Sequence, residues 1–317
     1  MIIKNNIYGK FEIDSPVIIE LINSKPLQRL KKISQYGVPD EFYHLKNYSR
    51  FQHSIDVFLL LKKLEASEEE QIAGLLHDMS HTAFSHVVDW VLGDGKTEEF
   101  QNEKHREFLK KSEVSTILKK YGYNPNRIAN HSIYSLLEQE IPKLCADRIG
   151  YSLREFPKKT AIYCIENILN RNGKILFKNE KSAFIFGINF LKMQTNHWGG
   201  LEATSRYRLF ANVLKLALNK KIISFSDFWE DEKMILKKID KAKNSSIDKI
   251  LYVLRKKSLS NLAKSREVVY KKFRYVDPVF LENGKLFKLS KVNKKFNAIL
   301  KNARKINKKG VNLPFID

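Results

Sequence analysis

Four of the eight histidines of this chain lie in one short stretch, residues 50–86. Within it His77 and Asp78 are adjacent, and His53 lies one apolar segment upstream. Imidazole nitrogen and carboxylate oxygen together suit Mn, Fe, Zn, Ni or Mg, whereas a thiolate set indicates structural zinc. Because these histidines occupy positions where a core prefers leucine or valine, we interpret them as ligands of a divalent metal ion.

Two helices are expected to bring these ligands together. Ser67 and Glu70 form an S-x-x-E pattern, which is typical of a helix start, and a helix is predicted over 68–78. Another apolar helix is predicted over 51–65 and carries His53 near its beginning. Neighbouring side chains on a helix point about 100° apart, so the adjacent histidine and aspartate reach one ion most easily at a helix end.

Helical patterns dominate the remaining sequence and predict a mainly α fold with one or two small β-hairpins. Continuous helices are predicted over 126–139 and 141–155. Residues 1–14 are expected to form a short hairpin or an extended lead-in. The two hairpin candidates are NGKILFKNEKS, with Asn179-Glu180 in its turn, and FLENGKLFKLS, whose Asn283-Gly284 is a strong turn dipeptide.

Composition indicates a folded protein. The 317 residues are 43% hydrophobic, which suffices for a sizeable core. The apolar runs are too short to span a bilayer, and the first residues lack the pattern of a secretory signal. With only two cysteines, the sequence therefore predicts a cytoplasmic protein that has no membrane partner.

Positive charge is concentrated near the end of the chain. Residues 231–317 contain 24 Lys and Arg against 8 Asp and Glu, which accounts for most of the net charge of +22. We therefore place a domain boundary near 220, with a basic, mainly helical region over 221–317. Such a region can bind nucleic acid or another polyanion, and it can equally be a solvated helical surface.

The order of several motifs resembles the HD-domain superfamily, and within it the deoxynucleoside-triphosphate triphosphohydrolases. The segments LINSKPLQRLKKISQYG, YSRFQHS and QIAGLLHDMSHTAFSHVVD follow the order of that family, and NEKHREF and ADRIGYSLRE continue it less closely. The H…HD…D pattern is shared by many HD phosphohydrolases, whereas the QRL and HDMSHTAFSH segments are more specific. The resemblance implies a helical HD-domain core with a basic C-terminal extension.

The resemblance also implies roles for individual residues. The implied metal ligands are His53, His77, Asp78 and Asp147. The implied catalytic residues are His81 at the cleaved phosphate and His105, paired with Asp89. The implied substrate-binding residues are Arg50, Arg148 and Tyr151 at the phosphates, Gln35 and Glu155 at the sugar hydroxyl, and Tyr207 over the nucleoside.

The reaction that the resemblance implies is metal-dependent hydrolysis of a nucleoside triphosphate, preferably a deoxynucleotide, to nucleoside and tripolyphosphate. Two alternatives stay open. One is another phosphomonoesterase or phosphodiesterase, with a second ion held by His81, His86 and His105. The other is a nucleic-acid-binding protein or nuclease that uses the basic C-terminal region. Members of this family commonly form dimers or larger assemblies, so a homo-oligomer also stays open.

Several implied residues also have a plain structural interpretation. Asp89 follows His86 by three residues, so these two can pair on a helix surface. His105 lies in a charged helical segment, Arg148 can form a simple salt bridge, and Tyr207 can serve packing alone. The histidines outside the pattern are interpreted as structural; they are His44, His131 and His197.

Three positions depart from the family pattern. In the vertebrate member of this family, an acidic residue and an arginine bind an activating guanine nucleotide. The matching positions here are Asn23 and Lys31. Tyr36 replaces the leucine that packs against deoxyribose. Activation by guanine nucleotide and exclusion of a ribose hydroxyl are therefore open for this chain.

Overall fold

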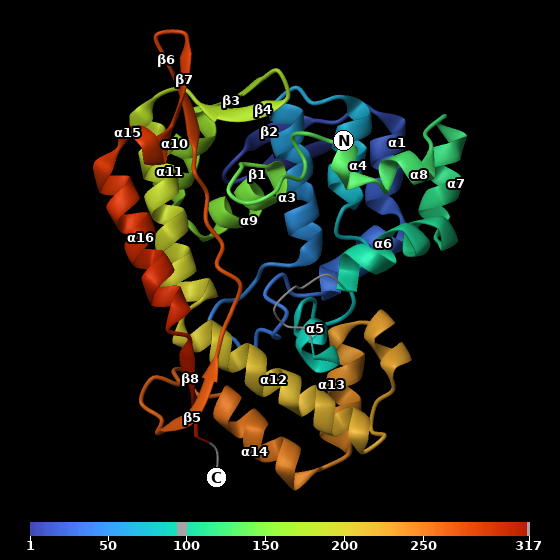
Figure 1. Cartoon of the computed structure of the whole chain (residues 1–317). Helices are drawn as coiled ribbons and strands as arrows, with labels where there is room; N and C mark the ends of the chain where they lie inside the picture. Colours follow the sequence, from blue (N-terminus) through green and yellow to red (C-terminus); the bar gives the residue numbers. More distant parts are fainter. Residues whose placement is uncertain (94–99, 316–317) are drawn as a thin grey trace.

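The computed structural model describes residues 1–93 and 100–315. Its fold is mainly α, as predicted (Figure 1). The helices are α1 (Pro16–Asn23), α2 (Lys25–Arg29), α3 (Arg50–Lys63), α4 (Glu68–Leu76), α5 (Val87–Leu92), α6 (Phe100–Lys111), α7 (Glu113–Lys120), α8 (Pro125–Ile128), α9 (Ala146–Glu155), α10 (Lys158–Glu166), α11 (Glu180–Met193), α12 (Leu201–Asn219), α13 (Glu232–Lys241), α14 (Ser245–Leu254), α15 (Leu289–Val292) and α16 (Lys294–Lys308).

The strands form three small sheets. The strands are β1 (Ile2–Asn5), β2 (Gly9–Glu12), β3 (Ile168–Arg171), β4 (Lys174–Phe177), β5 (Lys264–Val269), β6 (Val279–Glu282), β7 (Lys285–Lys288) and β8 (Val311–Pro314). β1 pairs with β2, β5 pairs with β8, and the order of the third sheet is β3-β4-β6-β7. In that sheet β4 and β6 run parallel, so the two hairpins predicted far apart in the sequence become neighbours.

Two of the hairpin predictions are confirmed and one turn is wrong. β1 and β2 form the amino-terminal hairpin, and Asn283-Gly284 joins β6 to β7. The turn of the remaining hairpin lies at Asn172-Gly173, where both residues have positive φ, and not at Asn179-Glu180. Asn179 instead caps α11, because its side chain accepts a hydrogen bond from the Ser182 N–H.

The helix predicted over 126–139 is also wrong, because only α8 and one short 3-10 turn form before α9 begins at residue 146. The Glu70 carboxylate accepts hydrogen bonds from the N–H groups of Leu136 and Leu137, at 2.7 and 3.1 Å, and this replaces helical bonding there. Pro142 further disfavours helix at the residue before it. The result is an irregular loop that reaches the active site.

The buried apolar residues form two clusters. The first cluster joins β1, α1, α3, α4, α9 to α11 and α16, and Phe58, Phe186 and Phe296 are among its members. The second cluster joins α5 and α12 to α14, with Phe84 and Phe210 among its members. Residues from both sides of position 220 occur in each cluster, and the domain boundary there stays a prediction.

Among the described residues, no helix is both long and apolar enough to cross a membrane.

Candidate metal centre and active site

Helix ends position the metal ligands. Ser49 starts α3 with a capping box to Gln52, which places His53 in the first turn of the helix. His77 directly follows α4, whose start is capped by Ser67 as predicted. Asp147 lies in the first turn of α9, where the positive end of the helix dipole favours a carboxylate.

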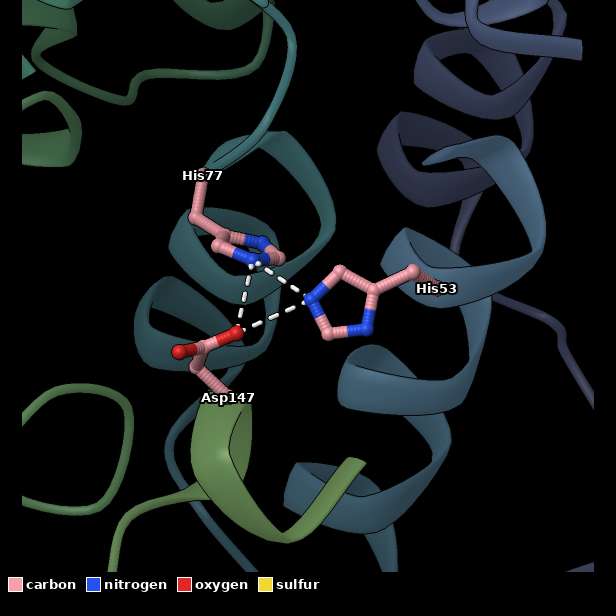
Figure 2. Close-up of side chains that lie close together, drawn as sticks. All are labelled: His53, His77 and Asp147. Atoms are coloured by element: carbon pink, nitrogen blue, oxygen red, sulfur yellow. Dashed lines mark hydrogen bonds and ion pairs between the residues drawn. The ribbon is translucent and has the colours of Figure 1, made fainter. Parts of the chain in front are cut away.

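Three of the four implied ligands converge on one point (Figure 2). The Nε2 atom of His53 lies 2.9 Å from Asp147 Oδ1 and 3.2 Å from His77 Nε2. His77 Nε2 lies 3.5 Å from the same carboxylate oxygen. Both histidines are buried, so this is a compact donor set inside the protein.

The hydrogen bonds around the two histidines turn their Nε2 lone pairs toward the convergence point. His77 Nδ1 donates to the Gly74 carbonyl at 2.7 Å. The Tyr48 hydroxyl donates to Asp56 at 3.2 Å and therefore accepts from His53 Nδ1 at 3.3 Å. Two nitrogen lone pairs and a carboxylate oxygen that face one another repel unless a cation lies between them. This donor set therefore fits a divalent metal ion.

The electrostatics of the cluster also favour positive charge. Burial opposes ionisation of Asp147, yet the neighbouring His53 and His77 imidazoles hold the pKa of this carboxyl far below its usual value. Burial likewise opposes charge on His77, but the carboxylates of Asp78 and Asp147 raise the pKa of this imidazole to about 9. The carboxylates thus attract a proton or a metal cation to this point.

Asp78 lies beside the convergent group and not within it. Its Oδ1 is 3.4 Å from His77 Nε2, and its Oδ2 is 3.7 Å from His53 Nε2. The same Oδ2 accepts a hydrogen bond from Arg50 NH1 at 2.7 Å. Arg50 therefore holds the carboxylate next to the cluster.

The two arginines implied at the phosphates are buried and partly occupied, because each guanidinium donates to three protein groups. The acceptors of Arg50 are Asp78, Ser85 Oγ and the Gln35 carbonyl. The acceptors of Arg148 are the carbonyls of Gln139 and Lys143 and the sulfur of Cys145. Both side chains line the active-site cavity and hold nearby loops in place.

The catalytic residues are placed differently from expectation in one respect. In the described part of the chain Asp89 contacts His86, at 3.3 Å, and not His105. His105 Nδ1 instead lies 3.0 Å from Ser80 Oγ. The predicted His105–Asp89 pairing is therefore wrong, because the turn before α5 aims Asp89 at its i−3 neighbour.

His105 keeps one ring nitrogen for other partners. Its Nε2 and that of His131 are buried without a hydrogen-bond partner among the described residues, and the two ring centroids are 4.5 Å apart. Burial and the neighbouring His131 hold the pKa of His105 well below the usual histidine value. His81 contacts Asp78 at 3.3 Å, and burial together with Arg50 lowers its pKa to about 3. Both imidazoles are therefore neutral near pH 7.

The second ion suggested for His81, His86 and His105 has no convergent donor set among the described residues. The other convergent group there contains Glu138, Cys145 and Asp147. Burial and the charge of Asp147 raise the pKa of Glu138 to about 7.

One cavity of about 260 Å³ joins the metal ligands to a group of aromatic residues. Most of the implied site residues line it, namely His77, Asp78, His81, Asp147, Gln35, Arg50, Arg148, Tyr151, Glu155 and Tyr207. The remaining three, His53, Asp89 and His105, do not line it. Tyr36 and Tyr43 also line the cavity and stack with ring centroids 5.3 Å apart.

The cavity also contains residues that the sequence did not single out. His197, interpreted as structural, bridges Glu155 through Nδ1 at 2.5 Å and the Tyr43 hydroxyl through Nε2 at 3.0 Å. Other additions to the lining include His131, Glu138, Lys271, Lys272 and Arg274. No local pattern marks these residues, because tertiary folding alone brings them to the cavity.

Comparison with known proteins agrees with this site. The HD domain family model matches residues 50–167. YdhJ of Bacillus subtilis is 34% identical over 98% of each chain. The metal-dependent phosphohydrolase cns2 of Cordyceps militaris is 35% identical over 49% of this chain and 45% of its own. The deoxynucleoside triphosphate triphosphohydrolase SAMHD1 homologue of Dictyostelium discoideum is 35% identical over 32% of this chain and 23% of its own.

A solved structure has the same fold over nearly the whole chain. It is a hypothetical protein of Aquifex aeolicus with a TM-score of 0.64 and 16% identity, and the match covers 96% of this chain and 99% of that one. Together with the convergent donor set, the family model and the sequence relatives confirm the expected family and a divalent metal cofactor. The chain belongs to the HD-domain superfamily of metal-dependent phosphohydrolases.

Proposed function

We propose that this chain hydrolyses a nucleoside triphosphate, preferably a deoxynucleotide, to nucleoside and tripolyphosphate. The observation that carries the proposal is that metal ligands, two arginines and a pair of stacked tyrosines line one cavity. Such a cavity offers separate surroundings for the reacting phosphate, the remaining phosphates and the nucleoside. The SAMHD1 homologue of Dictyostelium discoideum is named as a deoxynucleoside triphosphate triphosphohydrolase, which supports the same reaction.

The proposed ligands of the ion are His53, His77, Asp78 and Asp147. A bound divalent ion polarises a phosphoryl oxygen and lowers the pKa of a bound water, which supplies charge stabilisation and a nucleophile. Arg50 orients Asp78 through the 2.7 Å hydrogen bond and keeps two further N–H groups for phosphate oxygens. Its guanidinium therefore links the metal ligands to the substrate.

Departure of the nucleoside requires a proton on the 5′-oxygen. In the proposed mechanism His105 donates this proton from Nε2 beside His131, which lines the cavity, while Nδ1 stays hydrogen-bonded to Ser80. Burial disfavours the charged imidazole in the free protein. Negative phosphate charge raises the pKa of a nearby imidazole, so we expect His105 to take up its proton when substrate binds.

Recognition of the nucleoside is proposed for the aromatic residues of the cavity lining. These residues include Tyr36, Tyr43 and Tyr207, which offer aromatic faces and hydroxyls. Glu155 is held by His197 and by the indole N–H of Trp198 at 3.0 Å, so its carboxylate has a fixed position from which to accept a sugar hydroxyl.

Product analysis tests the proposal. Purified protein is incubated with Mn²⁺ and each of the eight common deoxynucleoside and ribonucleoside triphosphates, and products are separated by ion-exchange chromatography. We expect nucleoside plus tripolyphosphate, and none of either with a His77→Ala, Asp78→Ala double variant. The double variant controls for contaminating phosphatases.

Other products would contradict the proposed cleavage position. Release of orthophosphate or of a nucleoside monophosphate, absent with the double variant, would mean that the same metal site cleaves a different bond. Nucleoside release from ribonucleotides as fast as from deoxynucleotides would contradict the sugar preference alone.

A further inference from the structure

The extended segment between β5 and β6 brings part of the basic C-terminal region into the active site. We call residues 270–278 the strap. Figure 1 shows it in orange, running along the molecule from β5 at one end to β6 at the other. Lys271, Lys272 and Arg274 of the strap line the same cavity as the metal ligands.

Main-chain hydrogen bonds fix the strap against the helices beneath it. The buried Gln194 accepts from the Arg274 backbone N–H through Oε1 at 3.1 Å, and donates to Asn307 Oδ1 at 2.8 Å. Asn307 in turn donates to the Lys271 carbonyl at 3.1 Å. Because these bonds use backbone atoms, they set the path of the strap independently of its side-chain charges.

The side chains of the strap divide between two environments. Phe273 and Tyr275 stack at 5.3 Å, and the Arg304 guanidinium of α16 lies over both rings, at 5.7 and 4.9 Å from their centroids. Successive side chains of an extended segment point to opposite sides. Lys272 and Arg274 alternate with these two rings, and both line the cavity, as does Lys271.

The position of Arg274 relative to the metal ligands is favourable for a phosphate chain. Tyr151, Arg148 and Arg274 line the same cavity. Tyr151 follows Asp147 by four residues on α9, about one helical turn of 5.4 Å. Arg274 therefore borders the cavity that the metal ligand Asp147 also lines.

The charges already described leave a need for such groups. Arg50 and Arg148 each donate to three protein acceptors, which limits the forked contacts they can offer to phosphate oxygens. The cavity also contains the carboxyl groups of Glu138 and Glu155. A polyphosphate chain in this space therefore requires further positive charge.

We propose that Lys272 and Arg274 bind the outer phosphates of a polyphosphate substrate and thereby select triphosphates over monophosphates. The proposal rests on the proposed function and assigns part of the C-terminal basic charge to the active site. Lys271 belongs to the nucleoside end instead, since its Nζ lies 3.8 Å from the ring centroid of Tyr207.

Binding of inorganic anions tests this role without requiring turnover. Tripolyphosphate and orthophosphate are titrated by calorimetry into the Mn²⁺-loaded protein. We expect a Lys272→Ala, Arg274→Ala variant to bind tripolyphosphate about tenfold or more weakly and orthophosphate almost unchanged, because charged hydrogen bonds to the outer phosphates are lost. Arg274→Lys should recover part of the affinity because it keeps the charge.

The matched control removes two exposed lysines of the same basic region that do not line the cavity, Lys291→Ala with Lys301→Ala. Equal loss in this control, unchanged tripolyphosphate affinity in the strap variant, or no preference of the unmodified protein for tripolyphosphate would each overturn the proposal. If the double variant does not fold, Arg274→Lys and Lys272→Gln are compared singly. Strap-dependent binding without tripolyphosphate release would refute the proposed reaction and leave the strap role standing.

Discussion

The metal ligands of the active-site cavity are held in place differently from its aromatic and basic side chains. Helix termini position the metal ligands His53, His77 and Asp147, and hydrogen bonds of Nδ1 orient the two imidazoles. The aromatic and basic side chains of the lining come from segments that are far apart in the sequence, as Tyr36, Tyr207 and Lys271 illustrate. The difference indicates that the metal chemistry depends on few rigid contacts, whereas substrate choice depends on how distant segments pack.

Removing one converging ligand should give the largest effect. We expect Asp147→Asn to lower hydrolysis by about a thousandfold or more, because a bound metal supplies several kcal/mol of transition-state stabilisation. The neutral amide also removes the carboxylate that favours positive charge at His77. Activity assays and the metal content of the purified protein check this prediction. Full metal content with full activity would show that the convergent group is not the metal site.

The support of a ligand should matter less than the ligand itself. Tyr48→Phe removes the hydroxyl that links His53 Nδ1 to Asp56 and leaves the ring in place. Loss of such an outer partner typically costs 10–100-fold in metal affinity or activity. A Mn²⁺ titration of both proteins measures the change. Tyr134→Phe is a control, since its hydroxyl bonds the Arg127 carbonyl away from the site; equal weakening in both variants would argue against a specific role of Tyr48.

A change at Tyr36 should alter the preference between deoxyribose and ribose and leave metal binding unchanged. Tyr36 carries a hydroxyl where the resembling family has leucine, so it can hydrogen-bond a ribose 2′-hydroxyl. We expect Tyr36→Leu to raise the ratio of kcat/KM for dATP over ATP by about tenfold, because the ribose hydroxyl loses a partner. Tyr36→Phe separates the hydroxyl from the ring. A ratio that is unchanged in both variants would place sugar recognition elsewhere.

The smallest effect on activity is expected where the two hydrophobic clusters meet. There the Glu232 carboxyl accepts from the N–H groups of Ser34 and Phe84, at 2.9 and 3.3 Å. Burial outweighs these bonds and raises its pKa from 4.5 to about 8. The folded state therefore favours protonated Glu232, and its stabilisation, fully present below pH 4.5, is lost as the pH rises through 8.

Glu232→Gln tests this linkage, because the amide oxygen can accept both hydrogen bonds and cannot ionise. Relative to the variant, the unmodified protein should lose on the order of a few kcal/mol of unfolding free energy between pH 5 and pH 9. Denaturant unfolding at several pH values measures the difference. Parallel curves for the two proteins would mean that the carboxyl ionises without penalty.

The metal site was largely predictable because the sequence patterns that indicate it are local. The capping pattern of Ser67 and Glu70, the adjacent His77 and Asp78, and the apolar helix after His53 each lie within one helix or at its end. The mainly α fold followed from the same periodicity. These features need only the sequence within a few residues, which local propensity and patterning describe.

The remaining part of the site could not be predicted, because its contacts join residues far apart in sequence. The 129–145 loop looks helical by pattern, but the carboxylate of Glu70 captures its backbone N–H groups. Nothing near Arg274 indicates that Gln194 and Asn307 will draw it to the cavity. The expected Asp89 contact failed for a related reason, since the local turn directs this carboxylate to His86.

The position of the strap in the sequence has a consequence for synthesis. All the converging metal ligands have been made once Asp147 is in place, whereas the strap begins only at residue 270. At roughly 5–20 residues per second, the ribosome takes on the order of ten seconds to add the intervening chain. A nascent chain has thus made its ion ligands well before the residues proposed to hold a polyphosphate.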